Sequence, residues 1–168
     1  MSLESHLQSL KEKYSSKLIL LEKTEKNRLK LQVTQENLLE VMQCLKYEMG
    51  FSSLESIAGL DWETYFEVVY HIDRWDGDPT LLQVHVRLDD RENPMVPSLT
   101  SIWASANWHE RELWDLYGIS VKDHPNLKRL LLPDEWDEFK HKHISELYPM
   151  RKEYKLPEKP YSFKPHPK

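Results

Sequence analysis

The sequence predicts an α+β domain of two layers, in which helices pack on a mixed or antiparallel sheet, followed by an extended C-terminal arm. Residues 65–72 and 82–88 alternate between apolar and polar side chains, which is the period of a β-strand. Residues 76–79, Asp-Gly-Asp-Pro, form a turn signal between them, so the two segments should pair as an antiparallel hairpin. A stripe at helical spacing is the third observation and is formed by Leu38, Met42, Leu45 and Met49.

The N-terminal part supplies a helix and a second hairpin. Residues 3–14 carry leucines at helical spacing and predict an amphipathic helix. Residues 17–22 form a short apolar run that predicts a strand, and residues 28–34 alternate cleanly. Residues 23–27 are the expected turn between these two strands.

The striped helix has signals at both ends. Thr34 is its predicted N-terminal cap, with Glu36 in the first turn, and Gly50 is placed to end it. Residues 51–59 predict a further strand or an ordered connection, and residues 89–97 predict a charged loop. Together with the hairpin, this order favours an α+β domain over a doubly wound parallel sheet.

The composition changes near residue 133. Residues 133–168 contain six prolines, and residues 151–168 hold six Lys or Arg against two Glu, a local charge of +4 in a chain of net charge −5. Proline removes backbone donors and favours extended chain. We therefore expect a domain over residues 1–132 and a basic arm over residues 133–168 that lies along a neighbouring surface or is disordered.

Composition also excludes several classes of function. The single cysteine, Cys44, cannot form an intramolecular disulfide or hold an iron–sulfur cluster alone, and beside the helical stripe it is expected to be buried and inert. Four glycines are too few for a Gly-rich phosphate loop, and the acidic balance argues against a general nucleic-acid role. No run of about 18 apolar residues and no signal-peptide pattern is present, so we expect a cytoplasmic protein.

Residues 108–131 are the most informative segment, because they open with a run of charged and aromatic residues that ends at a glycine. Ser98 predicts a cap, and Asn107 followed by Glu110 resembles a capping box. Gly118 should end this helix. On a helical wheel Glu110 falls within an apolar stripe. The stripe consists of Trp103, Ala106, Leu113, Trp114 and Tyr117.

A carboxylate on an apolar face needs a partner. We expect Glu110 to cap the helix or to pair with a basic residue such as Lys128 or Arg129. Arg111 and Asp115, four residues apart, should pair with each other.

Three functions compete for this segment. Glu110 and Asp115 with His109 or His124 could form an acid–base site, and His124 with His141 and His143 could bind zinc. The third function, an interface with Trp, Tyr and Arg anchors, agrees best with the composition. A nucleic-acid-binding module that uses the basic tail is a further alternative and predicts salt-sensitive binding.

The segment resembles the signature of the C subunit, the 30-kDa subunit, of respiratory complex I, the NADH:quinone oxidoreductase. The pattern is Glu-Arg-Glu, an acid, two apolar residues, a His or Lys, a basic residue and two apolar residues at fixed gaps. This chain supplies it in register with Glu110, Arg111, Glu112, Asp115, Leu116-Tyr117, His124, Lys128 and Leu130-Leu131. Trp108, Gly118, Pro125 and Arg129 also fit the family.

The resemblance implies a cofactor-free subunit of the peripheral arm, on the cytoplasmic side of the membrane. It would contact homologues of the D, B and I subunits, and reach the membrane only through the complex. Iron–sulfur clusters and a flavin or equivalent would lie in partner subunits of the complex. Related subunits occur in ferredoxin-dependent and deazaflavin-dependent dehydrogenases and in membrane-bound hydrogenases. An insertion near residues 137–147 separates the signature from Tyr148-Pro149-Met150-Arg151, which resembles the family's His-Pro-Leu-Arg.

Overall fold

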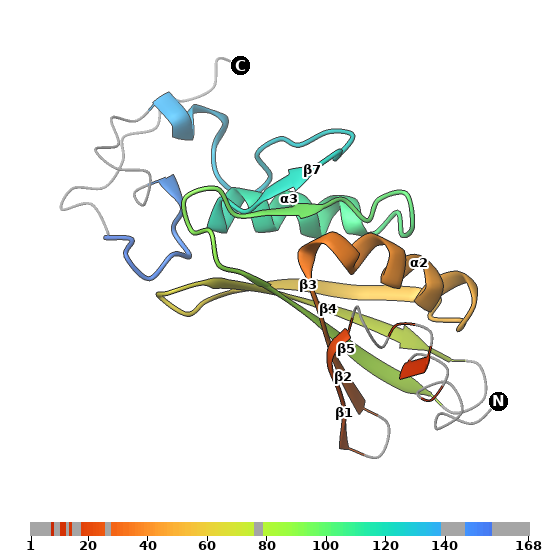
Figure 1. Cartoon of the computed structure of the whole chain (residues 1–168). Helices are drawn as coiled ribbons and strands as arrows, with labels where there is room; N and C mark the ends of the chain where they lie inside the picture. The colour runs from red at the N-terminus through yellow and green to blue at the C-terminus, as the bar shows by residue number, and fades with distance from the viewer. Residues whose placement is uncertain are drawn as a thin grey trace.

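The computed structural model describes residues 8, 11, 12, 14, 18–25, 28–75, 79–138 and 147–155. Over these residues the chain forms two layers, a twisted sheet and helices that cover one face of it (Figure 1). The strands of the main sheet are β1 Leu18–Glu25, β2 Arg28–Val33, β3 Ser53–Asp61, β4 Phe66–Arg74 and β5 Thr80–Leu88. The helices are α2 Leu38–Tyr47 and α3 Ala106–Tyr117, with short 3₁₀ helices η1 Gln35–Asn37 and η2 Asp134–Glu138.

The strand order is β1-β2-β5-β4-β3, in which β2 and β5 run parallel and the other neighbours run antiparallel. The sheet is therefore mixed, and both predicted hairpins, β1–β2 and β4–β5, are confirmed. A second, two-stranded sheet pairs β6 Met95–Pro97 with β7 Ser120–Lys122 in parallel. The predicted charged loop over 89–97 thus ends in a short strand. Three residues are too few to show the alternation that marks a strand in the sequence.

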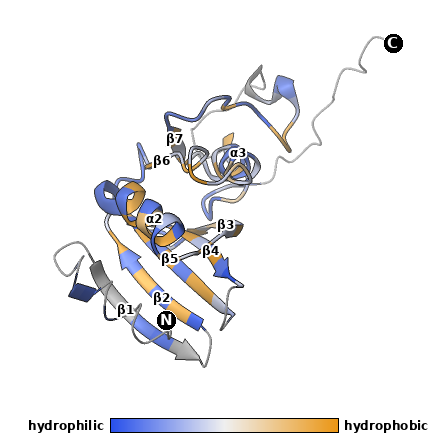
Figure 2. Cartoon of the chain, turned by 90° about the vertical axis from the view of Figure 1, so that its right-hand side faces the viewer, coloured by the Kyte–Doolittle hydropathy of each residue, from blue (hydrophilic) through white to orange (hydrophobic). Residues whose placement is uncertain are grey.

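The register places one apolar row across the sheet. Leu31 lies beside Val84, Val84 beside Tyr70, and Tyr70 beside Ile57. All four side chains are buried and belong to one hydrophobic cluster that also contains the stripe of α2. Figure 2 shows the alternation of apolar and polar residues along the strands beneath α2. The predicted inward faces of the strands and of the striped helix are therefore confirmed.

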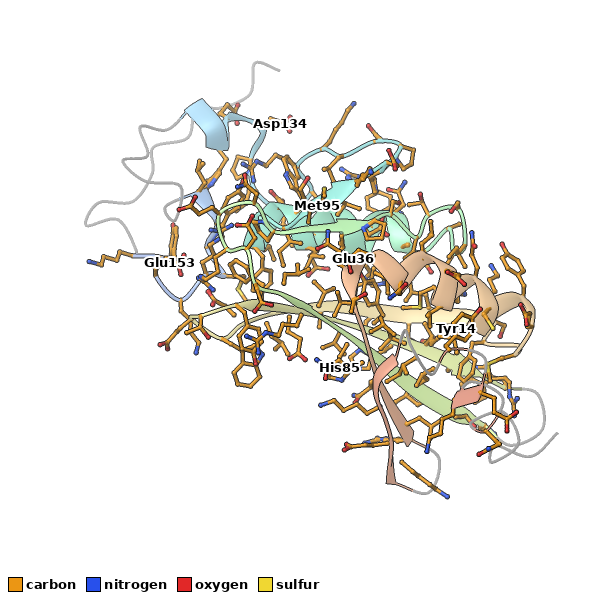
Figure 3. All side chains as sticks on the ribbon, in the orientation of Figure 1. Tyr14, Glu36, His85, Met95, Asp134 and Glu153 are labelled. Atoms are coloured by element: carbon orange, nitrogen blue, oxygen red, sulfur yellow. The ribbon has the colours of Figure 1, made fainter. Side chains whose placement is uncertain are left out.

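The opposite face of the sheet is polar. Ser56 Oγ lies 3.0 Å from His71 Nδ1, and His85 Nδ1 lies 2.9 Å from Glu67 Oε1. Figure 3 shows His85 on this side of the sheet, away from α2 and α3. Because side chains alternate along each strand, the same strands that bury one face leave this polar row on the other.

Of the two predicted end signals of the striped helix, the glycine is confirmed and the N-terminal cap is not. Gly50 has a positive φ of 77°, and the amide of Phe51 donates to Leu45 O at 3.0 Å, so the glycine ends α2 as predicted. Thr34 precedes η1 but makes no side-chain cap; its hydroxyl accepts from Asn37 Nδ2 at 2.9 Å instead. The predicted cap is wrong in this detail, because a 3₁₀ turn lies between Thr34 and α2.

Parts of the predicted termini lie outside the described residues. In the predicted helix over residues 3–14, residues 8, 11, 12 and 14 are helical, and Tyr14 is buried in the core. In the predicted arm, residues 147–155 pack against α3 and the β3–β4 turn, while residues 139–146 and 156–168 are outside the described part. The division of the chain at residue 132 stays a prediction. None of the described helices is long and apolar enough to cross a membrane.

Candidate interface site at the signature helix

Helix α3 carries the signature and lies over β3 (Figure 1). It begins at Ala106 after Ser105, which makes no side-chain cap, so the predicted capping box at Asn107 is wrong. Gly118 adopts the left-handed conformation, with φ at 69°, and its amide donates to Trp114 O at 2.9 Å. The predicted end of the helix is therefore confirmed. Upstream, residues 99–103 form a separate turn, in which the amide of Trp103 donates to Leu99 O at 2.8 Å.

Glu110 joins these two segments. Its side chain is 1% exposed and accepts from Ser98 Oγ at 2.7 Å and from the Leu99 amide at 2.5 Å. Ser98 Oγ in turn accepts from the Thr100 amide at 3.2 Å, so Ser98 caps this turn, and residues 99–103 do not form the predicted helix. Burial raises the pKa of Glu110 to about 7, and the bonds from Leu99 and Ser98 offset only part of this rise. The expectation that Glu110 caps its own helix or pairs with Lys128 or Arg129 is therefore wrong.

Asp115 binds the loop that follows β7. It is fully buried, and its Oδ1 accepts from Arg129 Nη1 at 2.8 Å. Its Oδ2 accepts from three consecutive amides, those of Leu130, Leu131 and Leu132, at 3.0, 2.7 and 3.0 Å. Burial favours the neutral acid, but Arg129 and the three amides outweigh it and lower the pKa of Asp115.

Arg111 binds the backbone carbonyl groups of the same loop. Its Nε donates to Lys128 O at 3.1 Å and its Nη2 to Arg129 O at 2.8 Å. The guanidinium also lies over the ring of Trp108, 5.0 Å from its centroid. The predicted pair between Arg111 and Asp115 is wrong, because each side chain has a backbone partner on residues 128–132 within closer reach.

His124 is oriented by two backbone groups. Its Nδ1 accepts from the Asn126 amide at 3.0 Å, so the proton lies on Nε2, which faces Asn107 O at 3.3 Å. Its side chain is 0% exposed and its Nε2 lies 3.8 Å from Glu110 Oε2. Burial lowers the pKa of His124, and Arg111 adds to this effect. Pro125 follows it in an exposed turn.

These contacts bear on the two enzyme hypotheses. Glu110 and His124 lie close together but are shielded from solvent, and both oxygens of Asp115 are held by structural partners. Of the proposed zinc ligands, His141 and His143 lie outside the described residues. Among the described residues, no group of three or more His, Cys, Asp or Glu side chains is placed to hold a metal ion.

Two signature residues of α3 face outward. Trp108 is 59% exposed on α3, and Glu112 is exposed with no hydrogen bond or ion pair to any residue that the structure describes. The side chain of Lys128 is also exposed, in the same loop as Leu131, which is 59% exposed. The exposed surface is therefore apolar as well as charged, and it includes a tryptophan, a residue type enriched in protein interfaces.

The end of α3 is held by residues outside the signature. Tyr117 O accepts from Arg151 Nε at 2.7 Å, and the ring of Tyr148 covers Gly118. Figure 3 shows Glu153 at this end of the sheet, where its Oε2 accepts from Arg91 Nη2 at 2.9 Å. The segment after the insertion therefore returns to the signature helix.

Asp61 fastens the same segment to the sheet, and no sequence pattern pointed to it. Its carboxylate accepts from Arg91 Nη1 at 2.6 Å and from the amide of Lys152 at 3.0 Å. These bonds hold the pKa of Asp61 at about 2 against the opposing effect of burial. The two partners are 30 and 91 residues away, so no local spacing marks them.

Comparison with known proteins places the signature in a family. The family described as "Respiratory-chain NADH dehydrogenase, 30 Kd subunit" matches residues 31–160, which include all of α3 and the loop that it holds. The chain belongs to this family. The resemblance that the signature suggested is therefore confirmed.

The relatives include subunits of two differently named dehydrogenases. The chain is 40% identical to the NADH-quinone oxidoreductase C subunit of Roseiflexus sp. over 65% of its own length and 64% of that protein, just under two thirds. It is 38% identical to the F(420)H(2) dehydrogenase C subunit of Methanosarcina mazei, over 76% of its length and 75% of that protein. It also matches 21% of an NADH-quinone oxidoreductase C/D subunit of Ectopseudomonas mendocina, at 36% identity over 74% of its own length.

A solved structure confirms the fold. The structure of the membrane-bound sulfane sulfur reductase, an archaeal respiratory membrane complex, contains a chain that superposes with a TM-score of 0.76 over 91% of this chain and 85% of that one. Sequence identity is 22%, so this likeness supports the α+β architecture and nothing finer.

Proposed function

We propose that this chain is a non-catalytic subunit of the peripheral arm of a membrane-bound oxidoreductase related to complex I, with NADH:quinone oxidoreductase as the leading assignment. The family match over residues 31–160 carries this proposal. The geometry of α3 supports it, because Glu110, Asp115 and His124 all have structural partners inside the chain. The subunit would support electron transfer to quinone coupled to ion translocation without reacting itself.

The proposed electron carriers, iron–sulfur clusters and a flavin or equivalent, belong to partner subunits. Four thiolates normally hold one cluster, and Cys44 is the single cysteine of this chain and is buried. The proposed partners are homologues of the D, B and I subunits, and contact with them would place the chain at the cytoplasmic side of the membrane. The C/D relative supports the first of these, because its name joins a C part and a D part in one protein.

The proposed contact surface includes Trp108, Lys128 and Leu131. An exposed tryptophan beside an arginine is a frequent anchor of binding energy in protein interfaces. Arg111 lies over the ring of Trp108, and this contact favours one orientation of the exposed aromatic side chain.

A second candidate is the equivalent subunit of a dehydrogenase that uses a reduced deazaflavin. The Methanosarcina relative favours it, since the identity of 38% there extends over 75% of that protein. Ferredoxin-dependent dehydrogenases and membrane-bound hydrogenases are the other members of this class. Their electron donors would be recognised by other subunits, so this chain is compatible with each.

Affinity purification of the tagged chain from its native membranes in mild detergent, followed by mass spectrometry, tests the proposal. Recovery of D, B and I homologues is the expected result, and the remaining subunits would identify the donor. A matched pair of variants tests the contact surface. Trp108→Ala should lower the recovery of partner subunits, whereas Trp75→Ala, at a residue 70% exposed just after β4, should leave it unchanged. Recovery of the wild-type chain alone, with bound metal, would contradict the proposal and favour a free-standing metal enzyme.

A further inference from the structure

A groove of about 220 Å³ is lined by residues of α3 and β3. One wall consists of three consecutive residues, Ile57, Ala58 and Gly59. Side chains alternate between the two faces of a strand, so a groove that touches three consecutive residues follows the edge of the strand. The groove therefore lies along the edge of β3, beneath the overhanging helix α3.

This edge is open within the part of the chain that the structure describes. β3 is the last strand in the sheet order, and its strand neighbour there is β4. Trp103 Nε1 and Ser105 Oγ donate to carbonyl groups at the start of β3, those of Ser52 and Leu54. The groove begins beyond these bonds. An exposed edge presents unpaired N–H and C=O groups that an added extended segment can bind.

The helix supplies an apolar wall. Leu113, Leu116 and Tyr117 lie on one face of α3 and line the groove, and Met150, which is 51% exposed, also lines it. Gly59 lets the helix approach the strand, because a Cβ there would lie 2.8 Å from the Tyr117 ring. The space between the walls has the size of one large apolar side chain.

Glu112 gives the groove its charge. It is the single charged residue among the groove's lining residues, and it is exposed. The neighbouring signature residues Glu110 and Arg111 are occupied by contacts inside the chain, whereas Glu112 has no described hydrogen-bond or ion-pair partner. An acidic group beside an apolar slot complements a basic group next to an apolar side chain.

We propose that this groove binds an extended segment of a partner subunit, which inserts an apolar side chain between α3 and β3 and places a Lys or Arg against Glu112. That the partner is a subunit of the same membrane complex rests on the proposed function. The segment adds backbone hydrogen bonds along the β3 edge, and the apolar slot and Glu112 set its register.

Charge reversal tests the pairing. Native complexes are purified through the tagged full-length chain carrying Glu112→Lys or, as the matched control, Glu92→Lys, an exposed acid in the loop before β6. We expect Glu112→Lys to lower partner recovery at least about tenfold and Glu92→Lys to leave it unchanged. Equal recovery with both variants would overturn the groove proposal alone. Failure of the wild-type chain to recover any partner would overturn the proposed function and the groove's partner with it.

Cross-linking identifies the occupant. Cys44 is the single cysteine and is 6% exposed, so Glu112→Cys introduces an accessible thiol at the groove. After coupling of a thiol-directed photo-cross-linker in the assembled complex, the expected product joins residue 112 to a partner peptide with a Lys or Arg beside an apolar residue. A product with this chain's own residues 156–168, with a second copy of the chain, or no product at all would overturn the proposal.

Discussion

Arg111 and Asp115 lie one turn apart on α3 and bind opposite groups of the same loop rather than each other. The cation donates to the carbonyl oxygens of residues 128 and 129, and the anion accepts from the amides of residues 130–132. Each charge thus satisfies backbone groups that no helix or strand pairs. This clamp joins the two halves of the signature, which are separated in sequence by β7.

Replacement of Asp115 by Asn should destabilise the protein more than any surface change. Asparagine removes the negative charge that the buried Arg129 guanidinium contacts at 2.8 Å and so loses this charge-assisted bond. We expect the free energy of unfolding to fall by about 3 kcal/mol, measured by urea denaturation of the full-length chain. Glu92→Gln is the exposed control and should change it by less than about 0.5 kcal/mol. A similar small effect at Asp115 would contradict the clamp.

Arg111→Lys tests the geometry of the second half of the clamp. Lysine keeps the charge but lacks the planar fork that reaches two carbonyl groups at once. We expect a loss of about 1 to 2 kcal/mol in the free energy of unfolding, since one of two bonds is lost. Arg87→Lys is the control, because Arg87 pairs with Asp89 on the surface. If both variants unfold alike while Arg111→Lys impairs assembly, Arg111 acts at the interface instead.

Glu110 should make stability fall as pH rises. Its pKa is about 7 in the folded protein against an ordinary 4.5, so between these values the unfolded chain loses the proton first. Its contribution is complete below pH 4.5 and is lost as pH approaches 7, a change on the order of 3 kcal/mol. Four other groups have the opposite effect, because their pKa values are lowered in the folded protein and their contribution to stability is lost as pH falls. They are Asp61, Asp115, His71 and His124.

The variant Glu110→Gln isolates this effect, because glutamine can keep bonds to Ser98 and Leu99 without a charge. The difference in unfolding free energy between the wild type and Glu110→Gln should shift in favour of the variant as pH rises from about 5 to about 7.5. Groups of the opposite sign cancel in this difference, since both proteins contain them. A difference that does not change with pH would show that Glu110 ionises normally in the folded protein.

The elements of this fold were predictable because their signals are local. The alternation in β4 and β5 and the stripe of α2 depend on residues two to four positions apart, and tertiary packing agreed with them. The left-handed Gly118 was predictable for the same reason. The short strands β6 and β7 were not, since each has three residues and gains its partner from 25 positions away.

The partners within the signature were harder to predict, because several polar groups competed for each charge. Sequence spacing allowed Glu110 to face Lys128 or Arg129 and Arg111 to face Asp115. The fold instead placed unpaired backbone groups nearer, at Leu99 for Glu110 and at residues 128–132 for the other two. Helical spacing fixes which side chains share a face but not which loop lies above that face.

Gly118→Ala should be more damaging than the same change at Gly50. Both glycines have positive φ, which costs about 1 kcal/mol for alanine. At Gly50 the nearest atom to a Cβ, on Arg74, is 3.5 Å away, whereas at Gly118 the Tyr148 ring would lie at 2.3 Å. We expect Gly118→Ala to cost at least about 2 kcal/mol by urea denaturation, with part of the loss recovered in the double variant with Tyr148→Ala. Equal costs at both glycines would show that Tyr148 does not cover α3.

Asp61→Asn should release residues 150–154 from the domain. The Asp61 carboxylate is 2% exposed and binds both Arg91 and the Lys152 amide, so it joins the β3–β4 turn to the chain after α3. Loss of its charge weakens two bonds to a charged group, and we expect the segment to open about tenfold more often. Trypsin cleavage after Arg151, followed by mass spectrometry, measures this opening, because Arg151 is 5% exposed in the closed state. Glu63→Gln is the control, since Glu63 pairs with Lys152 on the surface at 3.3 Å and should hardly affect the rate. Unchanged cleavage in Asp61→Asn would show that the Tyr148 and Arg151 contacts with α3 hold the segment without Asp61.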